Sequence, residues 1–460
     1  MRSIETEMLY EKPSKLLFRL SVPTVLMQLI TIIYNAADTF FVGKINNSAT
    51  AAVGVVFSVM SLIQAVGYGI GIGAGNLISI SLGEKQKDKA ETYANSAFLL
   101  AFFFGSLIAM IGLLTLEPLL RAVGATDEIL PYAEDYAFFI YVSAPLACLS
   151  FVLNSVMRSI GYAGRAMISM MVGGVFNIVF DPLFIFTLGL GIKGAAICTM
   201  LGHTLSVITM IILFLSKSSI LRINLKKISK DFKVYGRILK VGSPTVFRQG
   251  MGSVSTALLN SQAAKWGVDA VAAITVYSKI YALARSIVIG IGQGYQPIAG
   301  YNFGAKRYKR VRQTFVATVI YGTIVMTLIT VLLFFFRAEV SAFFRNDQEV
   351  VKIASAALIF GCISLPTLSY STFVNQTYQC LGFSFWATVL ASMRQGIFFI
   401  PILYIVSAFS IEKGIMTAQA LADVLTFVVS IPFQIVFFKK YLPIKPIEPK
   451  DEENAIDLTA

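Results

Sequence analysis

Charged residues are scarce in this 460-residue chain, at 14% of the total, whereas 56% of the residues are hydrophobic. The mean hydropathy is +0.73, and a soluble domain of this length does not need so much apolar surface. Because about twenty apolar residues form one membrane crossing, roughly twelve crossings fit into the chain. We therefore expect an all-α integral membrane protein.

Sequence patterns that carry common enzyme chemistry are also missing. The chain has one histidine, His203, and neither an HExxH pattern nor a GxxxxGK[ST] phosphate loop. Its cysteines form no CxxC pair, so we expect them to pack within apolar helices and not to form disulfides or bind metal; they are Cys148, Cys198, Cys362 and Cys380. These absences argue against an intramembrane enzyme and against ATP as an energy source, and we expect no cofactor.

The net charge of +13 follows the expected topology and does not indicate a nucleic-acid partner. Most of the 38 Lys and Arg residues lie at the termini or in alternate loops on one side of the predicted crossings. The positive-inside rule places these loops and both termini in the cytoplasm, as expected for a multi-pass protein of a cytoplasmic membrane. Anionic lipid head groups are the expected neighbours of these loops. Residues 1–15 carry charge but no apolar core, so we expect no removable signal peptide.

Twelve apolar segments are long enough to cross a bilayer. They are predicted at residues 17–42, 51–80, 92–116, 132–157, 166–188, 194–216, 238–262, 271–298, 313–336, 351–376, 386–409 and 414–438. The domain organisation that follows is an N-terminal six-helix lobe (1–216), a basic cytoplasmic linker (217–237), a C-terminal six-helix lobe (238–440) and a disordered tail (441–460).

The two sets of six segments are related by an internal repeat. A shift of 221 residues aligns the Pro-Thr-Val run at 23–25 with that at 244–246, and the Gly-x-Gly-x-Gly run at 69–73 with that at 290–294. Six crossings per repeat make the repeats parallel, an architecture typical of secondary transporters. Proline and glycine at these places indicate hinges or close helix packing; the hinge candidates are Pro23, Pro244, Gly71 and Gly73.

Polar residues interrupt the first crossing along one face. Their spacing of three or four residues puts them on one side of a helix; they are Gln28, Thr31, Asn35 and Asp38. A carboxylate in such a segment is costly to insert, so we expect this side to line a transport chamber. Desolvation favours the neutral form of an acid, so Asp38 could load a proton. Alternatively, it stays ionised and holds sodium with nearby amide and carbonyl oxygens.

A second intramembrane acid, Asp181, follows Asn177 by four residues and shares its helical face. Further polar residues of the first half, Asn154 and Thr199, are expected to line the cavity or support it, as are Gln28 and Asn35. The second half carries intramembrane cations instead, of which Arg285 and Arg394 are expected to lie deepest. These arginines either pair with acids or contact an anionic group on the substrate.

Together these residues resemble the MATE (multidrug and toxic compound extrusion) family of transporters. The matching motifs are Asn35-Ala-Ala-Asp38-Thr-Phe-Phe-Val-Gly43, Gly71-x-Gly73-x-Gly75, Asn177-x-x-x-Asp181-Pro182 and Gly290-Ile-Gly-Gln-Gly-Tyr-Gln-Pro297. The last run, with Arg394-Gln395-Gly396, looks most like the MepA-like branch of Gram-positive multidrug exporters. The resemblance covers residues from about 15 to 440. It implies two six-helix lobes around a central cleft, and a functional monomer.

The resemblance also implies export of organic, often cationic compounds, driven by inward flow of protons or sodium. It assigns ion coupling to Asp38 and Asp181, with Asn177 beside them, and any sodium would bind at the two acids. A shift of 221 carries Asp38 onto Leu259, so the acids are not repeated and coupling is expected in the N-terminal lobe alone. The alternative is a flippase for a lipid-linked saccharide or another anionic amphiphile, which Arg285 and Arg394 would suit.

Overall fold

The computed structural model describes residues 4–216, 220–345 and 347–443, and the regular elements in these ranges are all helical. The first half contains α1 (Ile4–Tyr10), α2 (Pro13–Gly43), α3 (Asn47–Gly83), α4 (Lys87–Leu114), α5 (Leu116–Val123), α6 (Leu130–Ser159), α7 (Ala163–Pro182), the π-helical segment η1 (Leu183–Thr187) and α8 (Ile192–Leu215). The second half contains the 3-10 turn η2 (Leu225–Lys227), α9 (Phe232–Trp266), α10 (Val268–Gly304), α11 (Tyr308–Phe335), α12 (Arg337–Phe344), α13 (Gln348–Cys380), α14 (Ser384–Ser392), the π-helical segment η3 (Met393–Ile397), α15 (Phe399–Phe409) and α16 (Ile411–Tyr441).

Each of the twelve predicted crossings falls on a long helix. Eleven spans among the described residues are long and apolar enough to cross a membrane, counting α7–η1 and α14–η3–α15 as one span each. The twelfth, α9, has sufficient length but a lower hydropathy. Its central part carries polar and charged side chains, namely Arg248, Gln249, Ser253, Ser255, Thr256, Asn260, Ser261 and Gln262. Such a helix cannot be surrounded by lipid, so α9 must turn these residues toward protein or water.

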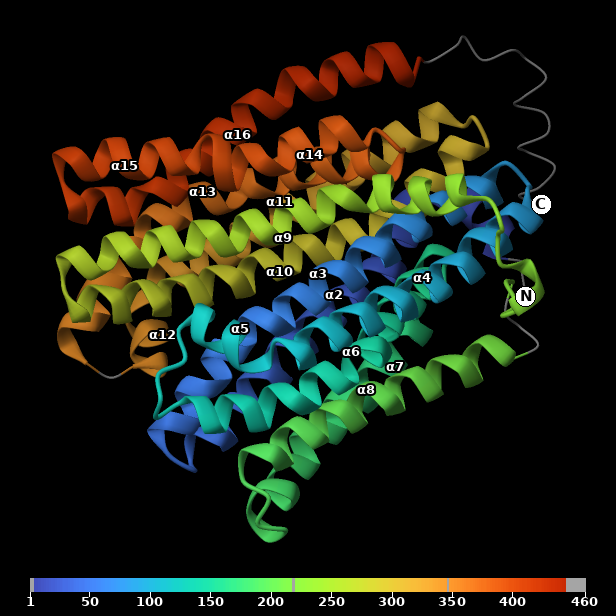
Figure 1. Ribbon diagram of the computed structural model, residues 1–460. Helices are drawn as coiled ribbons and strands as arrows, with labels where there is room; N and C mark the ends of the chain where they lie inside the picture. The colour runs from blue at the N-terminus through green and yellow to red at the C-terminus, as the bar shows by residue number, and fades with distance from the viewer. Residues whose placement is uncertain (1–3, 217–219, 346, 444–460) are drawn as a thin grey trace.

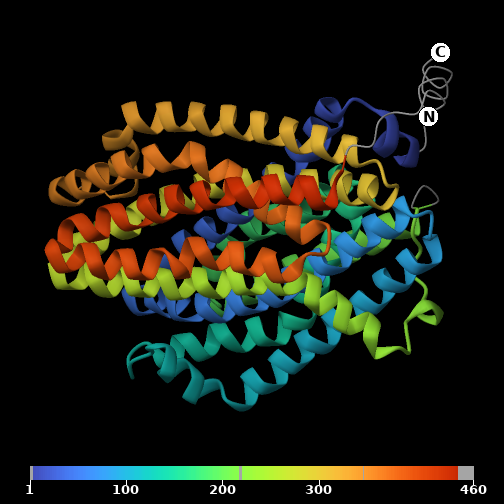
Figure 2. The ribbon, with the colours of Figure 1, turned by 90° about the horizontal axis from the view of Figure 1, so that it is seen from above.

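The two lobes lie side by side near the chain ends and diverge toward the opposite end of the molecule (Figure 1). Figure 2, turned by 90°, again places both termini at the same end. The hydrogen bonds between the lobes that involve described residues lie toward this end. Thr24 donates to the Gly290 carbonyl oxygen over 2.6 Å, and Asn302 donates to the Met8 carbonyl oxygen over 3.0 Å. We call this the closed end of the molecule.

Glycines on α3 let two different helices approach it closely. A β-carbon at Gly71 would lie 2.7 Å from Ser155 Oγ of α6, within the same lobe. One at Gly73 would lie 2.3 Å from the Ile238 carbonyl oxygen of α9, in the other lobe. A glycine spacing of two therefore serves opposite faces of one helix, and the repeat-related glycines of α10 divide in the same way.

The prolines proposed as hinges lie within continuous helices. α2 runs without a break through Pro23, and α9 runs through Pro244. The residues that follow them pack on glycines of the other lobe: a β-carbon at Gly290 would lie 2.7 Å from Val25 Cα, and one at Gly69 would lie 2.5 Å from a Val246 methyl carbon. The prolines therefore lie beside the closed inter-lobe contact, and their role as hinges stays a prediction.

The segment between the lobes docks on α4 at the closed end. Lys227 Nζ lies 2.6 Å from Asp88 and 2.5 Å from Glu91, and these carboxylates raise the pKa of Lys227 above its usual range. Asn95 accepts from the Asn224 backbone N–H over 2.8 Å. The linker is thus an extended strap with one 3-10 turn, and α9 begins at Phe232, before the predicted start of its crossing at 238. Most of the predicted disordered tail, residues 444–460, lies outside the described residues.

Candidate functional site

The two acids predicted for ion coupling are both buried in the N-terminal lobe. Asp38 on α2 is 6% exposed and Asp181 at the end of α7 is 0% exposed. Tyr136 of α6 donates to Asp38 Oδ2 over 2.7 Å, while Asp38 Oδ1 has no hydrogen-bond partner among the described residues. Neither oxygen of Asp181 has such a partner. The two acids lie on neighbouring helices, because α2 packs on α7, and each is near enough to interact with the charge of the other; together we call them the acid site.

Asn177 and two residues of α8 surround the Asp181 side of this site. Asn177 is buried, its Oδ1 has no hydrogen-bond partner among the described residues, and its Nδ2 lies close to Gly202 of α8. The Cys198 thiol lies near the Asp181 carboxyl and points toward the Asn177 carbonyl oxygen, 3.9 Å away. Thr199 is buried beside Cys198. The acid site therefore contains several oxygen atoms that lack a donor.

The other polar residues of the first crossing lie beside the acid site but are only partly buried. Asn35 Nδ2 donates to the Thr31 carbonyl oxygen over 2.8 Å, and Thr31 Oγ1 donates to the Met27 carbonyl oxygen over 2.9 Å. Gln28 is half-buried. These side chains satisfy much of their hydrogen bonding on their own helix, so Asp38 is the member of the face that faces fully into the lobe.

Asn154 and its repeat partner Asn375 make equivalent contacts. Asn154 Nδ2 donates to the Ala166 carbonyl oxygen over 3.0 Å, and Asn375 Nδ2 donates to the Ala387 carbonyl oxygen over 2.5 Å. In both lobes the amide thus joins the fourth crossing to the start of the fifth. Of the two roles predicted for Asn154, this geometry favours structural support of the cavity over lining it.

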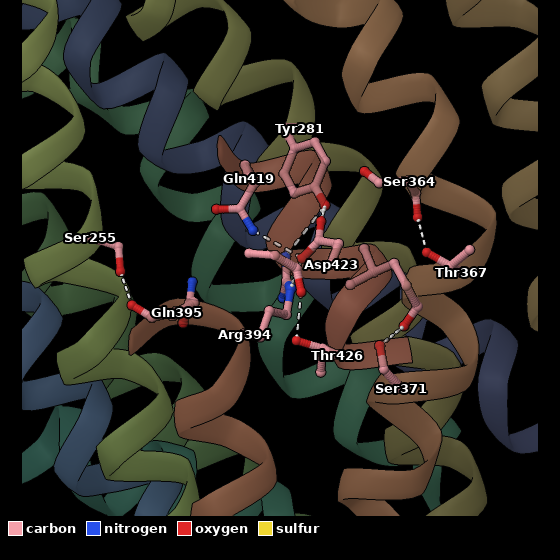
Figure 3. A network of polar contacts seen from close by, with 12 residues as sticks. Ser255, Tyr281, Ser364, Thr367, Ser371, Arg394, Gln395, Gln419, Asp423 and Thr426 are labelled. Atoms are coloured by element: carbon pink, nitrogen blue, oxygen red, sulfur yellow. Dashed lines mark hydrogen bonds and ion pairs between the residues drawn. The ribbon is translucent and has the colours of Figure 1, made fainter. Parts of the chain in front are cut away.

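The C-terminal lobe has a different polar centre, built around Asp423 of α16. Arg394 Nε lies 2.6 Å from Asp423 Oδ1, Gln419 Nε2 donates to the same oxygen over 2.9 Å, and Tyr281 donates to Oδ2. Figure 3 shows these side chains converging on the carboxylate. Asp423 is fully buried. Hydrogen bonds and an ion pair from its own lobe therefore satisfy this carboxylate.

Two more arginines lie near this pair, Arg248 on α9 and Arg285 on α10. The guanidinium groups of Arg248, Arg285 and Arg394 interact electrostatically. Gln395 satisfies both ends of its amide when its oxygen accepts from Arg285 Nη1 over 2.9 Å and its nitrogen donates to the Arg248 carbonyl oxygen over 2.9 Å. Arg394 thus pairs with an acid, whereas Arg285 is held by a neutral amide.

Sequence reasoning missed several members of these two centres. Tyr136 and Tyr281 donate to the two acids, but buried tyrosines are too common to stand out in a membrane helix. A shift of 220 residues aligns Asp423 with His203, whose ring lies edge-on to that of Phe151 at 5.8 Å. An acid within an apolar helix requires a partner, so the sequence already held the signal that could have paired Asp423 with an intramembrane arginine.

The remaining predictions from the sequence concern the cysteines and metal binding. The four cysteines are free and buried. Among the described residues, no three or more His, Cys, Asp or Glu side chains gather in a way that could hold a metal ion. The acid site contains two carboxyls and one amide, which is a donor set for a monovalent cation or a proton.

Comparison with known proteins gives a consistent set of relatives. The MatE family model matches residues 23–183 and 244–405, one stretch in each half. Multidrug export protein MepA of Staphylococcus saprophyticus is 26% identical over 419 residues, covering 90% of this chain and 92% of the relative. MepA of Staphylococcus aureus (strain MSSA476) is 24% identical over 410 residues, covering 89% and 90%.

Solved structures share the fold. An outward-facing multidrug resistance MATE family transporter of the MOP superfamily has a TM-score of 0.90 at 24% identity, covering 95% of this chain and 98% of that one. A MOP superfamily transporter from Pyrococcus furiosus has a TM-score of 0.91 at 24% identity, covering 96% and 99%. These likenesses confirm the twelve-helix membrane fold with two lobes around a cleft. Because the family model matches most of both halves, the chain belongs to the MatE family of membrane transporters and is not an enzyme.

Proposed function

We propose that the protein exports small lipophilic organic compounds, many of them cationic, across the bacterial inner membrane in exchange for protons or sodium ions. Membership of the MatE family supports transport, and relatives that align along nearly their whole length are named multidrug export proteins. Both polar centres lie within one chain, so a monomer is sufficient for the cycle. Lipids surround the helices, and the transported compound is the small-molecule partner.

The main support for ion coupling is the environment of the Asp181 carboxyl. Its two carboxyl oxygens are buried, and the Cys198 thiol, a weak donor, is the one side-chain donor found beside them among the described residues. An ionised carboxylate buried in this way is unstable by several kcal/mol. The carboxyl is therefore stable in this conformation only with a proton or with a bound cation, and these are the two coupling ions that we propose.

The same residues would serve either ion. A proton would be shared across the electrostatically linked pair Asp38 and Asp181, since two neighbouring carboxylates disfavour full ionisation. Sodium would take oxygen ligands from Asp38, Asp181 and Asn177, whose Oδ1 is also without a donor. The hydroxyl of Tyr136 occupies Asp38 Oδ2 and so leaves Oδ1 for the ion.

The conformation indicates which step of the cycle is present. The lobes touch at the end that carries both termini, which the positive-inside rule assigns to the cytoplasm. The acid site lies toward the opposite end of the molecule, near the C-terminal ends of α2 and α7. We infer an outward-facing state in which the ion has loaded and the drug has left. Release of the ion to the inside would restore the charge and favour a new drug, because each ligand must prefer a different state for coupling to occur.

Dye efflux from liposomes that contain the purified protein tests this function. A lipophilic cation such as ethidium is loaded, and a proton gradient and a sodium gradient are imposed separately. Transport under one gradient, lost in Asp38→Asn, is the expected result. Asp269→Asn, an exposed acid of the C-terminal lobe, is the matched control and should transport normally. Normal transport by Asp38→Asn would show that the acid site does not couple the ion.

The arginines of the C-terminal lobe favour one alternative function, flipping of a lipid-linked saccharide or another anionic amphiphile. If folded wild-type protein moves no ethidium under either gradient, this alternative becomes the better explanation. Movement of a fluorescent diphosphate-linked lipid between leaflets, without a gradient, would then be expected.

A further inference from the structure

Three guanidinium groups share the middle of the C-terminal lobe, and a single acid balances them. In the part of the chain that the structure describes, Arg394–Asp423 at 2.6 Å is the only ion pair that these arginines form. Asp423 also accepts from Tyr281 and Gln419. Three positive charges and one negative charge give the cluster a net charge of +2. We call Arg248, Arg285 and the Arg394–Asp423 pair the arginine site.

This site cannot face lipid. Arginine stays protonated in proteins, and a charged side chain at the bilayer centre is strongly disfavoured. α9 packs on α3, and α10 packs on α2 and α3, so these are the helices by which the C-terminal lobe faces the other lobe. Arg248 and Arg285 are partly exposed, and the Arg394 side chain is 11% exposed. Because lipid cannot accept these charges, we infer that their exposed parts lie in water between the lobes.

The π-helical turn η3 and its contact with α9 hold the arginine site in place. Ser255 donates to the Gln395 carbonyl oxygen, and Gln395 in turn bonds Arg285 Nη1 and the Arg248 carbonyl oxygen. A β-carbon at Gly252 would lie 3.2 Å from the Gln395 amide, so glycine lets the turn approach α9. One neutral amide oxygen satisfies only one of the five N–H donors of Arg285. No other hydrogen bond of the Arg285 guanidinium is found among the described residues, so its remaining donors are available to a ligand.

We propose that Arg248 and Arg285 bind the anionic group, a carboxylate or a phosphate, of amphiphilic compounds that the protein transports. The inference rests on the proposed export function and gives it a substrate class. A guanidinium binds these planar or tetrahedral oxyanions through paired hydrogen bonds. A compound with both a cationic and an anionic group is therefore a better ligand than the corresponding simple cation.

Two dyes that differ in one group test this site. Rhodamine 110 carries a free carboxylate, and rhodamine 123 is its methyl ester. Their affinities are measured by fluorescence anisotropy with full-length protein in phosphatidylcholine nanodiscs. We expect rhodamine 110 to bind more tightly, and Arg248→Gln and Arg285→Gln each to weaken it about tenfold or more, as for lost hydrogen bonds between charged groups. Binding of rhodamine 123 should stay the same or improve.

The controls separate charge at this site from charge elsewhere and from misfolding. Lys279→Gln removes an exposed cation from the same helix as Arg285 and should leave both affinities unchanged. Arg285→Lys keeps the charge but loses the paired geometry, so its affinity for rhodamine 110 should be intermediate. Retained binding of rhodamine 123 shows that a variant is folded. Equal affinities of the wild type for the two dyes, or equal losses for both dyes in a variant that still binds rhodamine 123, would overturn the inference.

Transport separates this inference from the proposed function. If a gradient drives rhodamine 123 and the arginine variants move rhodamine 110 as the wild type does, only the anion site is overturned. If neither dye moves, the export function itself fails.

The anionic group could also belong to a lipid. Repeating the binding assay with phosphatidylglycerol in the nanodiscs distinguishes the sources. Unchanged affinity supports a free organic anion as the ligand. Alternatively, phosphatidylglycerol weakens rhodamine 110 binding to the wild type several-fold and leaves its binding to Arg285→Gln unchanged. That result supports competition by the lipid head group at the same site.

Discussion

Each lobe buries a carboxylate that accepts a hydrogen bond from a tyrosine, and the lobes differ in what else surrounds it. In the N-terminal lobe, Asp38 has Tyr136 on one oxygen and lies near a second acid, Asp181, that has no hydrogen-bond partner among the described residues. In the C-terminal lobe, Asp423 has Tyr281, and an arginine pairs with it. The centre in the N-terminal lobe thus contains two acids and, among the described residues, no paired cation, whereas the centre in the C-terminal lobe contains more arginines than acids.

The two lobes therefore share one framework but carry opposite electrostatic centres. The repeat preserved the close contacts of the glycines and the bond from Asn154 or Asn375 to the next helix. It did not preserve the titratable groups, nor the position of the π-helical turn, which follows Asp181 in one lobe and contains Arg394 in the other. Packing is therefore common to both lobes, and chemistry is specific to each.

The largest expected effect is that of Asp181→Asn on transport. Since an amide can neither carry a proton nor balance a sodium charge, gradient-driven efflux of ethidium should fall to the level of protein-free liposomes. The folded state should lose little stability, because the carboxyl makes no ion pair among the described residues and the amide is close to it in size. Efflux and thermal unfolding in detergent, measured on the same preparation, check both parts. A large drop in melting temperature would mean that Asp181 is a structural residue.

The same kind of substitution in the other lobe should act on stability. Asp423→Asn removes the fully buried acid that pairs with the largely buried Arg394, and breaking a buried ion pair costs about 3–5 kcal/mol. Unfolding should therefore occur at a much lower temperature and less folded protein should be recovered. The double variant Asp423→Leu/Arg394→Met removes both charges and should be more stable than Asp423→Asn. If it is no more stable, the ion pair does not account for the loss.

The sequence was sufficient for the fold because twelve apolar segments and one repeat register determine it. Asp38 and Asp181 could also be found, since an acid in an apolar helix is rare enough to stand out. What could not be read was which groups meet across helices. Tyr136 lies 98 residues from Asp38, and Tyr281 lies 142 residues from Asp423. Periodicity places a residue on a face of its own helix, but only packing decides which helix lies opposite.

The packing shared by the lobes can be tested at the inter-lobe glycines. Gly73→Ala would place a β-carbon 2.3 Å from the Ile238 carbonyl oxygen, and relieving such a clash typically costs about 1–3 kcal/mol. Because the contact closes only one end of the molecule, the variant should also favour states in which that end opens. Hydrogen exchange of α9 residues near 238 should increase.

Gly250→Ala is the matched control, because a β-carbon there meets nothing within 4 Å. In a helix interior this change should stabilise the protein slightly. Unchanged exchange near residue 238 in Gly73→Ala would show that the closed end is not held by this contact.

The smallest expected effects come from the two tyrosines, and they bear most directly on the difference between the lobes. Tyr136→Phe and Tyr281→Phe each remove one buried hydrogen bond to an acid, so each should cost about 1 kcal/mol of stability. Only Tyr136→Phe alters a group that we propose to exchange ions, so it alone should slow ethidium efflux per folded molecule. Initial rates normalised to folded protein check this. An equal slowing by Tyr281→Phe would mean that Asp423 also takes part in the cycle, and that coupling is not confined to the N-terminal lobe.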